Sequence, residues 1–315
     1  MKPLRLLATL TLCLVLASAG ALSATSPARP NLIVIYTDDH GYADLGIQGI
    51  LPDLKTPHID ALARSGVLAK HGYSTAPQCV PSRAGLMVGK FQSRFGVESN
   101  GDTLEGFDRE TTFATRLQRV GYATAQFGKW HLGPNPEITR HGFKHVFSQN
   151  AGQPFSANIT LDGQDRPMSN LPPELYHVDG CSRAAAALIE RYQREPFFLY
   201  IAYRAPHVPL DARQKYLDRF PGKMPERRRQ ALAMLSAVDD GPGERGQALG
   251  FGVKRSTHPF FLQPLARAAR SAHRRQAGLV CLNHSDVSNP ASTPSVRSHS
   301  CPCGYTDATP ASPRD

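Results

Sequence analysis

Two continuous apolar runs and one shorter apolar segment stand out along the chain. The runs are 31–37 and 196–203, and the shorter segment is 122–127. Runs of branched and aromatic residues without polar alternation are typical of strands buried on both faces of a parallel sheet. We therefore expect these three segments to be strands of one sheet.

Segments with helical periodicity alternate with the expected strands. In the segment up to Val67, apolar residues recur on one helical face, with Thr56 as a candidate cap and Pro57 at the first helical position. Further helices are predicted at 110–120, 181–192 and 224–238. The alternation favours an α/β domain with a mostly parallel sheet. In such a domain, ligands bind beyond the carboxyl ends of the strands.

Composition narrows the class of protein. The chain has 315 residues, of which 41% are hydrophobic, and this length suggests one large or two ordinary domains. A disordered, collagen-like or polytopic membrane protein is excluded. The net charge of +10 alone would favour an anionic partner, but half of the excess lies in 242–315, with nine Lys and Arg against four Asp and Glu. Because that segment lacks interleaved aromatic residues, we expect no nucleic-acid partner.

The amino terminus, 1–24, has the pattern of a secretory signal peptide. Lys2 and Arg5 precede an apolar stretch, 6–17, that is too short to span a bilayer, and small residues follow at 17–19. We expect export to the periplasm or the extracellular space, without stable membrane insertion after cleavage; an uncleaved anchor is the alternative. Five of the six cysteines would remain, so at least one would be unpaired.

Polar residues capable of chemistry follow each expected strand. Asp38 and Asp39 follow the first, Lys129 and His131 the segment 122–127, and His207 the last. Because the strands are expected to be parallel, these residues should converge at one sheet edge. Two adjacent carboxylates require a cation, and hard oxygen ligands favour Ca²⁺ or Mg²⁺. A structural role is the alternative for each residue. The two aspartates could form a capped turn with solvated carboxylates, Lys129 could be a surface lysine in an ion pair, and the two histidines could be core residues whose hydrogen bonds are satisfied.

A second motif, Cys79-Val-Pro-Ser-Arg83, precedes the small-residue stretch 84–89. A helix that begins near Ser82 would direct its free N–H groups at an anion. The forked guanidinium of Arg83 suits a tetrahedral oxyanion. For Cys79, a buried structural thiol or a disulfide partner is the alternative.

The Cys79-x-Pro81-Ser82-Arg83 motif resembles the signature of the formylglycine-dependent (type I) sulfatases, the family of arylsulfatases and N-acetylgalactosamine-6-sulfatases. Three further blocks resemble that family in its order: Asp38-Asp39 before Gly41-Tyr42, Gly128 to Gly133, and Ala205-Pro206-His207. The resemblance covers roughly 30–241. It implies an α/β, alkaline-phosphatase-like three-layer sandwich with a mostly parallel central sheet, and hydrolysis of sulfate esters, with sulfated glycans or aryl sulfates as substrates. A phosphodiesterase or phosphonate monoester hydrolase of the same superfamily is the alternative.

The resemblance also implies how the site is completed. A formylglycine-generating or equivalent maturation enzyme would convert Cys79 to Cα-formylglycine. A divalent metal, Ca²⁺ with Mg²⁺ possible, would be held by Asp38, Asp39 and residue 79, and would lower the pKa of the attacking hydroxyl.

The remaining roles implied by the resemblance belong to four side chains. Arg83 and Lys129 would neutralise charge on the sulfuryl oxygens. His207 would contact the sulfate and protonate the departing oxygen, and His131 would deprotonate the second hydroxyl of residue 79 so that sulfate leaves.

The resemblance ends after Gly241. The family continues with a strand that ends in Ser-Asp, followed by Asn or His and then Gly, which completes the metal site; a further lysine and a smaller C-terminal domain come after it. The segment 242–315 is instead rich in Ser and Pro, and Ser285-Asp286 matches that strand end only in part. We therefore expect a signal peptide (1–24), an incomplete catalytic domain (30–241) whose C-terminal part is missing, and a disordered or out-of-frame tail (242–315). An inactive sulfatase relic is a further alternative.

Overall fold

The computed structural model describes residues 29–69, 72–149, 156–161, 164–170, 176–243, 257–262 and 280–283. The expected signal peptide and most of the segment after Gly241, including Asp286, lie outside the described residues. Within the described part of the chain, no helix is both long and apolar enough to cross a membrane.

A single sheet organises the described residues. Its strands are β1 (Asn31–Tyr36), β2 (Gly66–Leu68), β3 (Ala123–Lys129), β4 (His145–Gln149), β5 (Ser156–Leu161), β6 (Gln164–Asn170), β7 (Phe197–Ala202), β8 (Thr257–Leu262) and β9 (Val280–Asn283). Their order is β2-β9-β8-β1-β7-β3-β4-β5-β6. The five neighbours from β8 to β4 are parallel, and the outer pairs are antiparallel. The three strands expected from the apolar segments are β1, β3 and β7, and they are adjacent.

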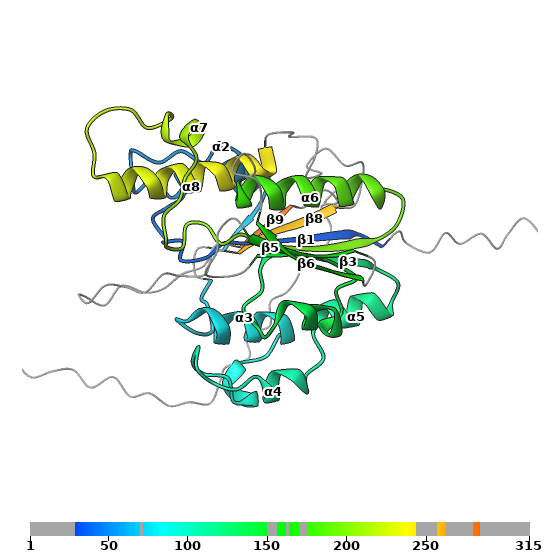
Figure 1. Cartoon of the computed structure of the whole chain (residues 1–315). Helices are drawn as coiled ribbons and strands as arrows, with labels where there is room; N and C mark the ends of the chain where they lie inside the picture. The colour runs from blue at the N-terminus through cyan, green and yellow to red at the C-terminus, as the bar shows by residue number, and fades with distance from the viewer. Residues whose placement is uncertain are drawn as a thin grey trace, which may run out of the picture. The chain divides into compact units, whose positions relative to one another are not determined.

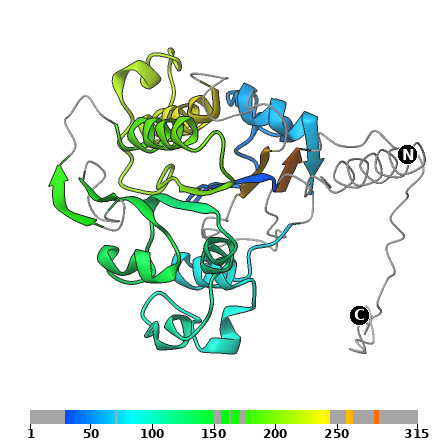
Figure 2. The same ribbon diagram turned by 90° about the vertical axis from the view of Figure 1, so that its right-hand side faces the viewer.

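Helices cover both faces of this sheet (Figures 1 and 2). One face carries α2 (Pro57–Ser65), α6 (His177–Arg191), α7 (Gln214–Leu217) and α8 (Glu226–Gly243). The other carries α3 (Cys79–Val88), α4 (Glu105–Asp108) and α5 (Phe113–Arg119). Short 3-10 helices are η1 (Gly46–Gln48), η2 (Gln92–Phe95) and η3 (Asn135–His141). The predicted three-layer α/β architecture is thereby confirmed.

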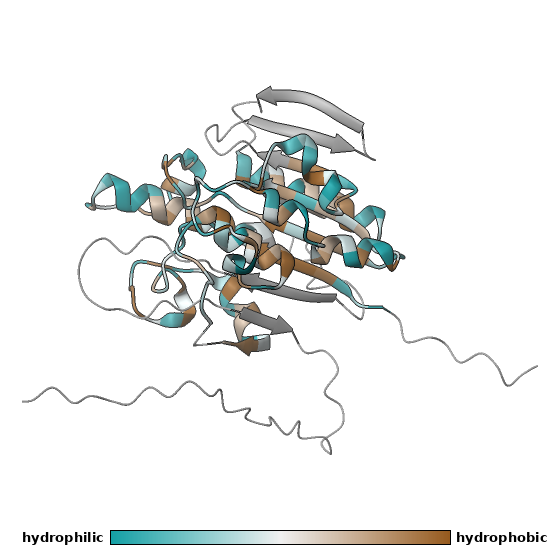
Figure 3. Ribbon diagram, turned by 90° about the horizontal axis from the view of Figure 1, so that it is seen from below, coloured by the Kyte–Doolittle hydropathy of each residue, from teal (hydrophilic) through white to brown (hydrophobic). Residues whose placement is uncertain are grey.

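The central strands are buried from both sides, which explains their continuous apolar sequences. Every residue of β7 is buried. Along β1, Ile33 and Ile35 belong to the core cluster that includes residues of α6, whereas Val34 and Tyr36 pack in the cluster that includes residues of α3. In Figure 3 the coloured central strands are mostly apolar, whereas the helices carry both apolar and polar segments. The strand ends that carry the polar residues therefore start from a fixed scaffold.

The expected cap of α2 differs from the structure. The Thr56 side chain does not cap α2; its hydroxyl donates instead to Asp60 Oδ1, at 2.8 Å. The cap comes from α8. The Asp239 carboxylate accepts hydrogen bonds from the backbone N–H groups of His58 and Ile59, at 3.3 and 2.8 Å. A partner so distant in the sequence leaves no local signal.

The segment after Gly241, expected to be a disordered or out-of-frame tail, contains two strands among its described residues, and the second, β9, comes just before the partial strand-end match at Ser285-Asp286 in the sequence. β8 pairs in parallel with β1, with Tyr36 opposite Leu262, and β9 pairs antiparallel with β8. The helix predicted at 224–238 extends further, because α8 continues through Pro242 and ends at Gly243.

Candidate functional site

Three neighbouring strand ends bring the candidate residues together. Tyr36 of β1 lies opposite Ala202 of β7, which lies opposite Gly128 of β3. The strands therefore end level with one another, and the residues that follow them share one edge of the sheet, as the sequence predicted. Gly128 permits the close approach of β3 to β7, because a Cβ there would lie 2.1 Å from the Ala202 carbonyl oxygen.

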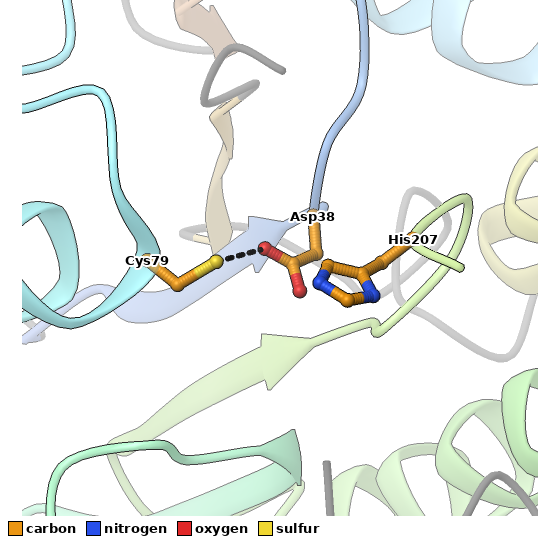
Figure 4. A group of neighbouring side chains, drawn as sticks. All are labelled: Asp38, Cys79 and His207. Carbon is orange, nitrogen blue, oxygen red and sulfur yellow. Dashed lines mark hydrogen bonds between the residues drawn. The ribbon is translucent and has the colours of Figure 1, made fainter. Parts of the chain in front are cut away.

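Asp38 lies at the centre of the site. Its carboxylate is buried and forms ion pairs with Lys129 through Oδ2 and with Arg83 through Oδ1, the latter at 3.5 Å. The Cys79 thiol donates to Oδ1 at 3.3 Å (Figure 4). Burial alone raises the pKa of Asp38, but Arg83 and Lys129 outweigh it and lower the pKa to about 2.

Cys79 is the first residue of α3, so this helix begins three residues before the expected start at Ser82. Burial, and next the charge of Asp38, raise the pKa of the half-buried thiol. The unmodified side chain is therefore a protonated thiol and a weak nucleophile at neutral pH. Cys79 and Cys181 are both free cysteines among the described residues, so the structure places neither in a disulfide.

Arg83 is fully buried beneath the site and held by aromatic residues that the sequence analysis did not single out. Its Nη1 donates to the Lys129 carbonyl oxygen at 2.7 Å and to the Tyr200 hydroxyl at 3.4 Å. Its guanidinium carbon lies 5.0 Å from the centroid of the Tyr36 ring. A usable sequence signal was the tyrosine on each of two strands expected to belong to the same sheet.

Nε and Nη2 of Arg83 have no hydrogen-bond partner among the described residues. A buried guanidinium that retains unused donors is suited to bind an oxyanion. Lys129 adds a second buried cation at the same place.

The two histidines differ in their surroundings. His131 has a lowered pKa of about 4, first because of burial and then because of the cations Lys129 and Arg83, and its Nδ1 is buried without a partner among the described residues. Its ring is therefore neutral at neutral pH and able to accept a proton. His207, on the loop after β7, places Nε2 at 3.5 Å from Oδ2 of Asp39.

Asp39 and His131 both adopt left-handed backbone conformations, with φ of 54° and 61°. Non-glycine residues in this region carry strain of about 1–3 kcal/mol, and such residues cluster at functional sites. Burial, and next the charge of Asp38, raise the pKa of Asp39. A cation beside these two carboxylates would relieve their repulsion.

The carboxylates fit a divalent cation in chemistry, but they supply only part of its coordination shell. At this site, the described donor atoms within 4.8 Å of one another belong to Asp38, Cys79 and His207, without Asp39 (Figure 4); a second such group, His58, Asp239 and Asp240, lies on α2 and α8. Ca²⁺ binds about six to eight oxygen ligands. The parallel neighbour β8 ends level with β1, but in the sequence it is followed by Gln263 and Pro264, neither of which is a carboxylate.

Comparison with known proteins gives consistent matches. The family model described as Sulfatase matches residues 30–273, a range that extends beyond Gly241. An arylsulfatase from Klebsiella aerogenes is 32% identical over 71% of this chain and 54% of its own length. An N-acetylgalactosamine-6-sulfatase from Mus musculus is 30% identical over 83% of this chain and 55% of its own length. The chain thus spans about half the length of these curated relatives.

Among solved structures, the protein Ps i-CgsB, crystallised with k-i-k-neocarrahexaose, superposes with a TM-score of 0.69. It is 26% identical, and the match covers 82% of this chain and 66% of that chain. The predicted alkaline-phosphatase-like fold class is confirmed by this likeness.

Proposed function

The chain belongs to the sulfatase family, and from that premise we propose that it hydrolyses sulfate esters at the site around Cys79. One observation carries the proposal: Cys79 lies at the start of α3 with two buried cations, Arg83 and Lys129, gathered beside it on Asp38. This arrangement supports recognition of an anionic group at residue 79.

The family uses a formylglycine and a divalent metal, and both have a place in the proposal. A maturation enzyme would supply the oxidant that converts the CH₂SH group of Cys79 to an aldehyde, whose hydrate offers a hydroxyl nucleophile. Asp38, Asp39 and the oxygen of residue 79 would hold Ca²⁺, or alternatively Mg²⁺, which would act as a Lewis acid. Because Gln263 and Pro264 follow β8, we expect this metal to bind weakly and turnover to be slow.

The chain's own side chains would divide the remaining work. Arg83 and Lys129 would neutralise the charge that develops on the sulfuryl oxygens. His207 would protonate the departing oxygen, because it is partly exposed and faces the site beside Asp39. His131 would take up a proton when sulfate is expelled, because its ring is neutral at neutral pH and its buried Nδ1 has no partner among the described residues.

The substrate class follows from the family alone. The two curated relatives are named an arylsulfatase and an N-acetylgalactosamine-6-sulfatase, which favours an aryl sulfate or a sulfated glycan over a phosphonate ester. The signal-like amino terminus favours export to the periplasm or the extracellular space.

The first test is a peptide mass at residue 79. The chain is co-expressed with a formylglycine-generating enzyme and digested. We expect the Cys79 peptide to lose the mass that separates CH₂SH from CHO, and the Cys181 peptide, outside the motif, to stay unchanged. A Cys79 peptide that retains its thiol would show that the proposed modification does not occur.

The second test compares an aryl sulfate with an aryl phosphonate monoester, in the presence of Ca²⁺. We expect slow sulfate release that is abolished in Cys79→Ala and accelerated when Gln263→Asp and Pro264→Asn are introduced together. Faster cleavage of the phosphonate would favour the alternative hydrolase. No sulfate release by the matured double variant would contradict the proposal itself.

A further inference from the structure

Arg204 is a buried cation, two residues beyond β7, to which the proposed mechanism gives no role. Its Nη2 donates to the carbonyl oxygen of Val208, and its Nη1 donates to that of Pro209 at 3.5 Å. Both carbonyls belong to the loop that carries His207. The guanidinium therefore holds the backbone of this loop by two neighbouring peptide groups.

The Val208 carbonyl has a second donor, which is the ring of His207. His207 Nδ1 lies within hydrogen-bond distance of that oxygen. A carbonyl oxygen can only accept, so Nδ1 must carry the hydrogen. In the neutral ring, Nε2 is then the unprotonated nitrogen, and it is Nε2 that lies 3.5 Å from Asp39 Oδ2.

The Val208 side chain is 49% exposed, so it does not itself fix its peptide group, whereas Ala205 and Leu210 on either side of it pack in or against the core. Two backbone bonds also hold the loop, from Asp38 N–H to the Ala205 carbonyl at 3.2 Å and from His207 N–H to the Arg204 carbonyl at 2.9 Å. These bonds fix the start of the loop, whereas the Val208 carbonyl is fixed by Arg204.

We propose that Arg204 is a positioning residue which, by holding the Val208 carbonyl, fixes His207 in the Nδ1–H tautomer and directs Nε2 to the site. The proposal rests on the function proposed above, in which His207 serves the departing oxygen. That step starts from the doubly protonated ring: its Nε2–H bond breaks, the departing oxygen gains the proton, and the Nε2 lone pair is restored. The Nδ1–H bond stays intact, and the ring is left as the Nδ1–H tautomer.

The experiment reads the tautomer directly and needs no turnover. The full chain is labelled with ¹⁵N-histidine, and long-range ¹H–¹⁵N spectra are recorded well above the ordinary pKa of histidine. His207→Gln identifies the His207 signals by their loss. We expect the wild-type Nδ1 to resonate in the protonated range and Nε2 in the unprotonated range.

In Arg204→Met the Val208 carbonyl loses its anchor. The Nδ1 and Nε2 signals of His207 should then exchange their ranges or move to intermediate values. Arg219→Met is the matched control: it removes an arginine that pairs with Asp240 on α8, and the His207 signals should stay in place. Arg204→Lys, which keeps the charge but has a single donor nitrogen in place of the two Nη atoms, should give an intermediate spectrum and serves if the methionine variant fails to fold.

Two results would overturn the proposal: an Nε2–H tautomer in the wild type, or an unchanged tautomer in a folded Arg204 variant. Neither depends on sulfate release. A chain that shows the expected tautomer but never hydrolyses a sulfate ester would contradict the proposed function and leave the role of Arg204 standing.

Discussion

The chain contains two Asp-Asp pairs, Asp38-Asp39 after β1 and Asp239-Asp240 on α8, and the protein treats them in opposite ways. In each pair the first carboxylate is buried. Burial raises the pKa of both, yet that of Asp38 is lowered to about 2 by two neighbouring cations, whereas that of Asp239 is raised to about 6. Asp239 accepts hydrogen bonds from two backbone N–H groups of α2, and these lower its pKa, but they do not outweigh the increase caused by burial.

The second members of the pairs differ as well. Asp240 forms two hydrogen bonds with the Arg219 guanidinium, at 2.9 and 2.6 Å, and is buried. Asp39 is more exposed and faces His207. The pair on α8 therefore contacts α2 and Arg219, and the pair after β1 presents a carboxylate to His207 at the edge of the sheet. The cations around the same dipeptide decide whether the pKa of its first carboxyl is lowered or raised.

The largest effect should follow from removal of Lys129, which would break the charge balance of the first pair. Lys129→Met leaves the buried Asp38 carboxylate with the more distant Arg83 as its charged partner, at 3.5 Å. A buried charge that loses a partner costs about 3–5 kcal/mol. Urea unfolding should show this loss in the free energy of unfolding.

Lys90→Met is the matched control, because Lys90 also pairs with a carboxylate, Glu110 at 2.7 Å, but at the surface. Exposed pairs contribute about 0–1 kcal/mol. Equal losses in the two variants would mean that Asp38 does not depend on Lys129, and the contrast between the Asp-Asp pairs would lose its basis.

A somewhat smaller effect, dependent on pH, is expected for Asp239. Its folded pKa of about 6 exceeds the ordinary aspartate value of 3.8, so between these values the folded chain binds more protons than the unfolded one. Its contribution to stability is therefore present in full below about pH 4 and lost as pH rises through 6. The whole loss corresponds to about 3 kcal/mol.

Asp239→Asn cannot ionise, so its stability relative to the wild type should rise across this window, measured by urea unfolding at several pH values. Asp53→Asn is the control of opposite sign, because a hydrogen bond from Arg228 lowers the pKa of Asp53. A difference between wild type and Asp239→Asn that stays constant with pH would contradict the raised pKa.

The sequence predicted the parts of this contrast that depend on local pattern. The strands β1, β3 and β7 were predictable because they are buried on both faces, and the convergence of Asp38, Lys129 and His207 followed from their position after parallel strands. The composition of the Cys79 motif pointed to an oxyanion site. These features need only periodicity, strand direction and residue chemistry.

The remaining features depend on contacts between distant segments. Asp239 caps α2 across 180 residues of sequence, and the local candidate, Thr56, was the wrong one. Arg204 acts on backbone carbonyls, for which no side-chain pattern exists. β8 was missed because its six residues follow a segment without helical or strand alternation, and pairing with β1 compensates for its weak local signal.

The affinity for Ca²⁺ should also distinguish the two Asp-Asp pairs. Asp39→Asn should weaken Ca²⁺ binding by about tenfold, or about 1.4 kcal/mol, because it removes one of few charged oxygen ligands. Asp240→Asn should leave the affinity unchanged, since Arg219 already occupies that carboxylate. Isothermal titration of the purified chain measures both constants.

The exchange of Gln263→Asp and Pro264→Asn should tighten the same binding by at least about tenfold, because it adds oxygen ligands after a strand that ends level with β1. The gain should disappear when Asp39→Asn is combined with it. Tighter binding that persists in the triple variant would place the metal elsewhere.

The smallest effect is expected where the second pair meets solvent. Arg219→Met breaks the two hydrogen bonds to Asp240. Because the Arg219 side chain is 42% exposed, water and dissolved ions replace much of the interaction. A loss of about 1 kcal/mol or less in the free energy of unfolding follows, and it should shrink further in 1 M salt, where the screening length is about 3 Å.

A loss as large as that of Lys129→Met, insensitive to salt, would mean that Asp240 is held by a buried cation just as Asp38 is. The two Asp-Asp pairs would then differ only in the partner of their first residue, and the position of the pair beyond a parallel strand, rather than its charge environment, would decide which one is functional.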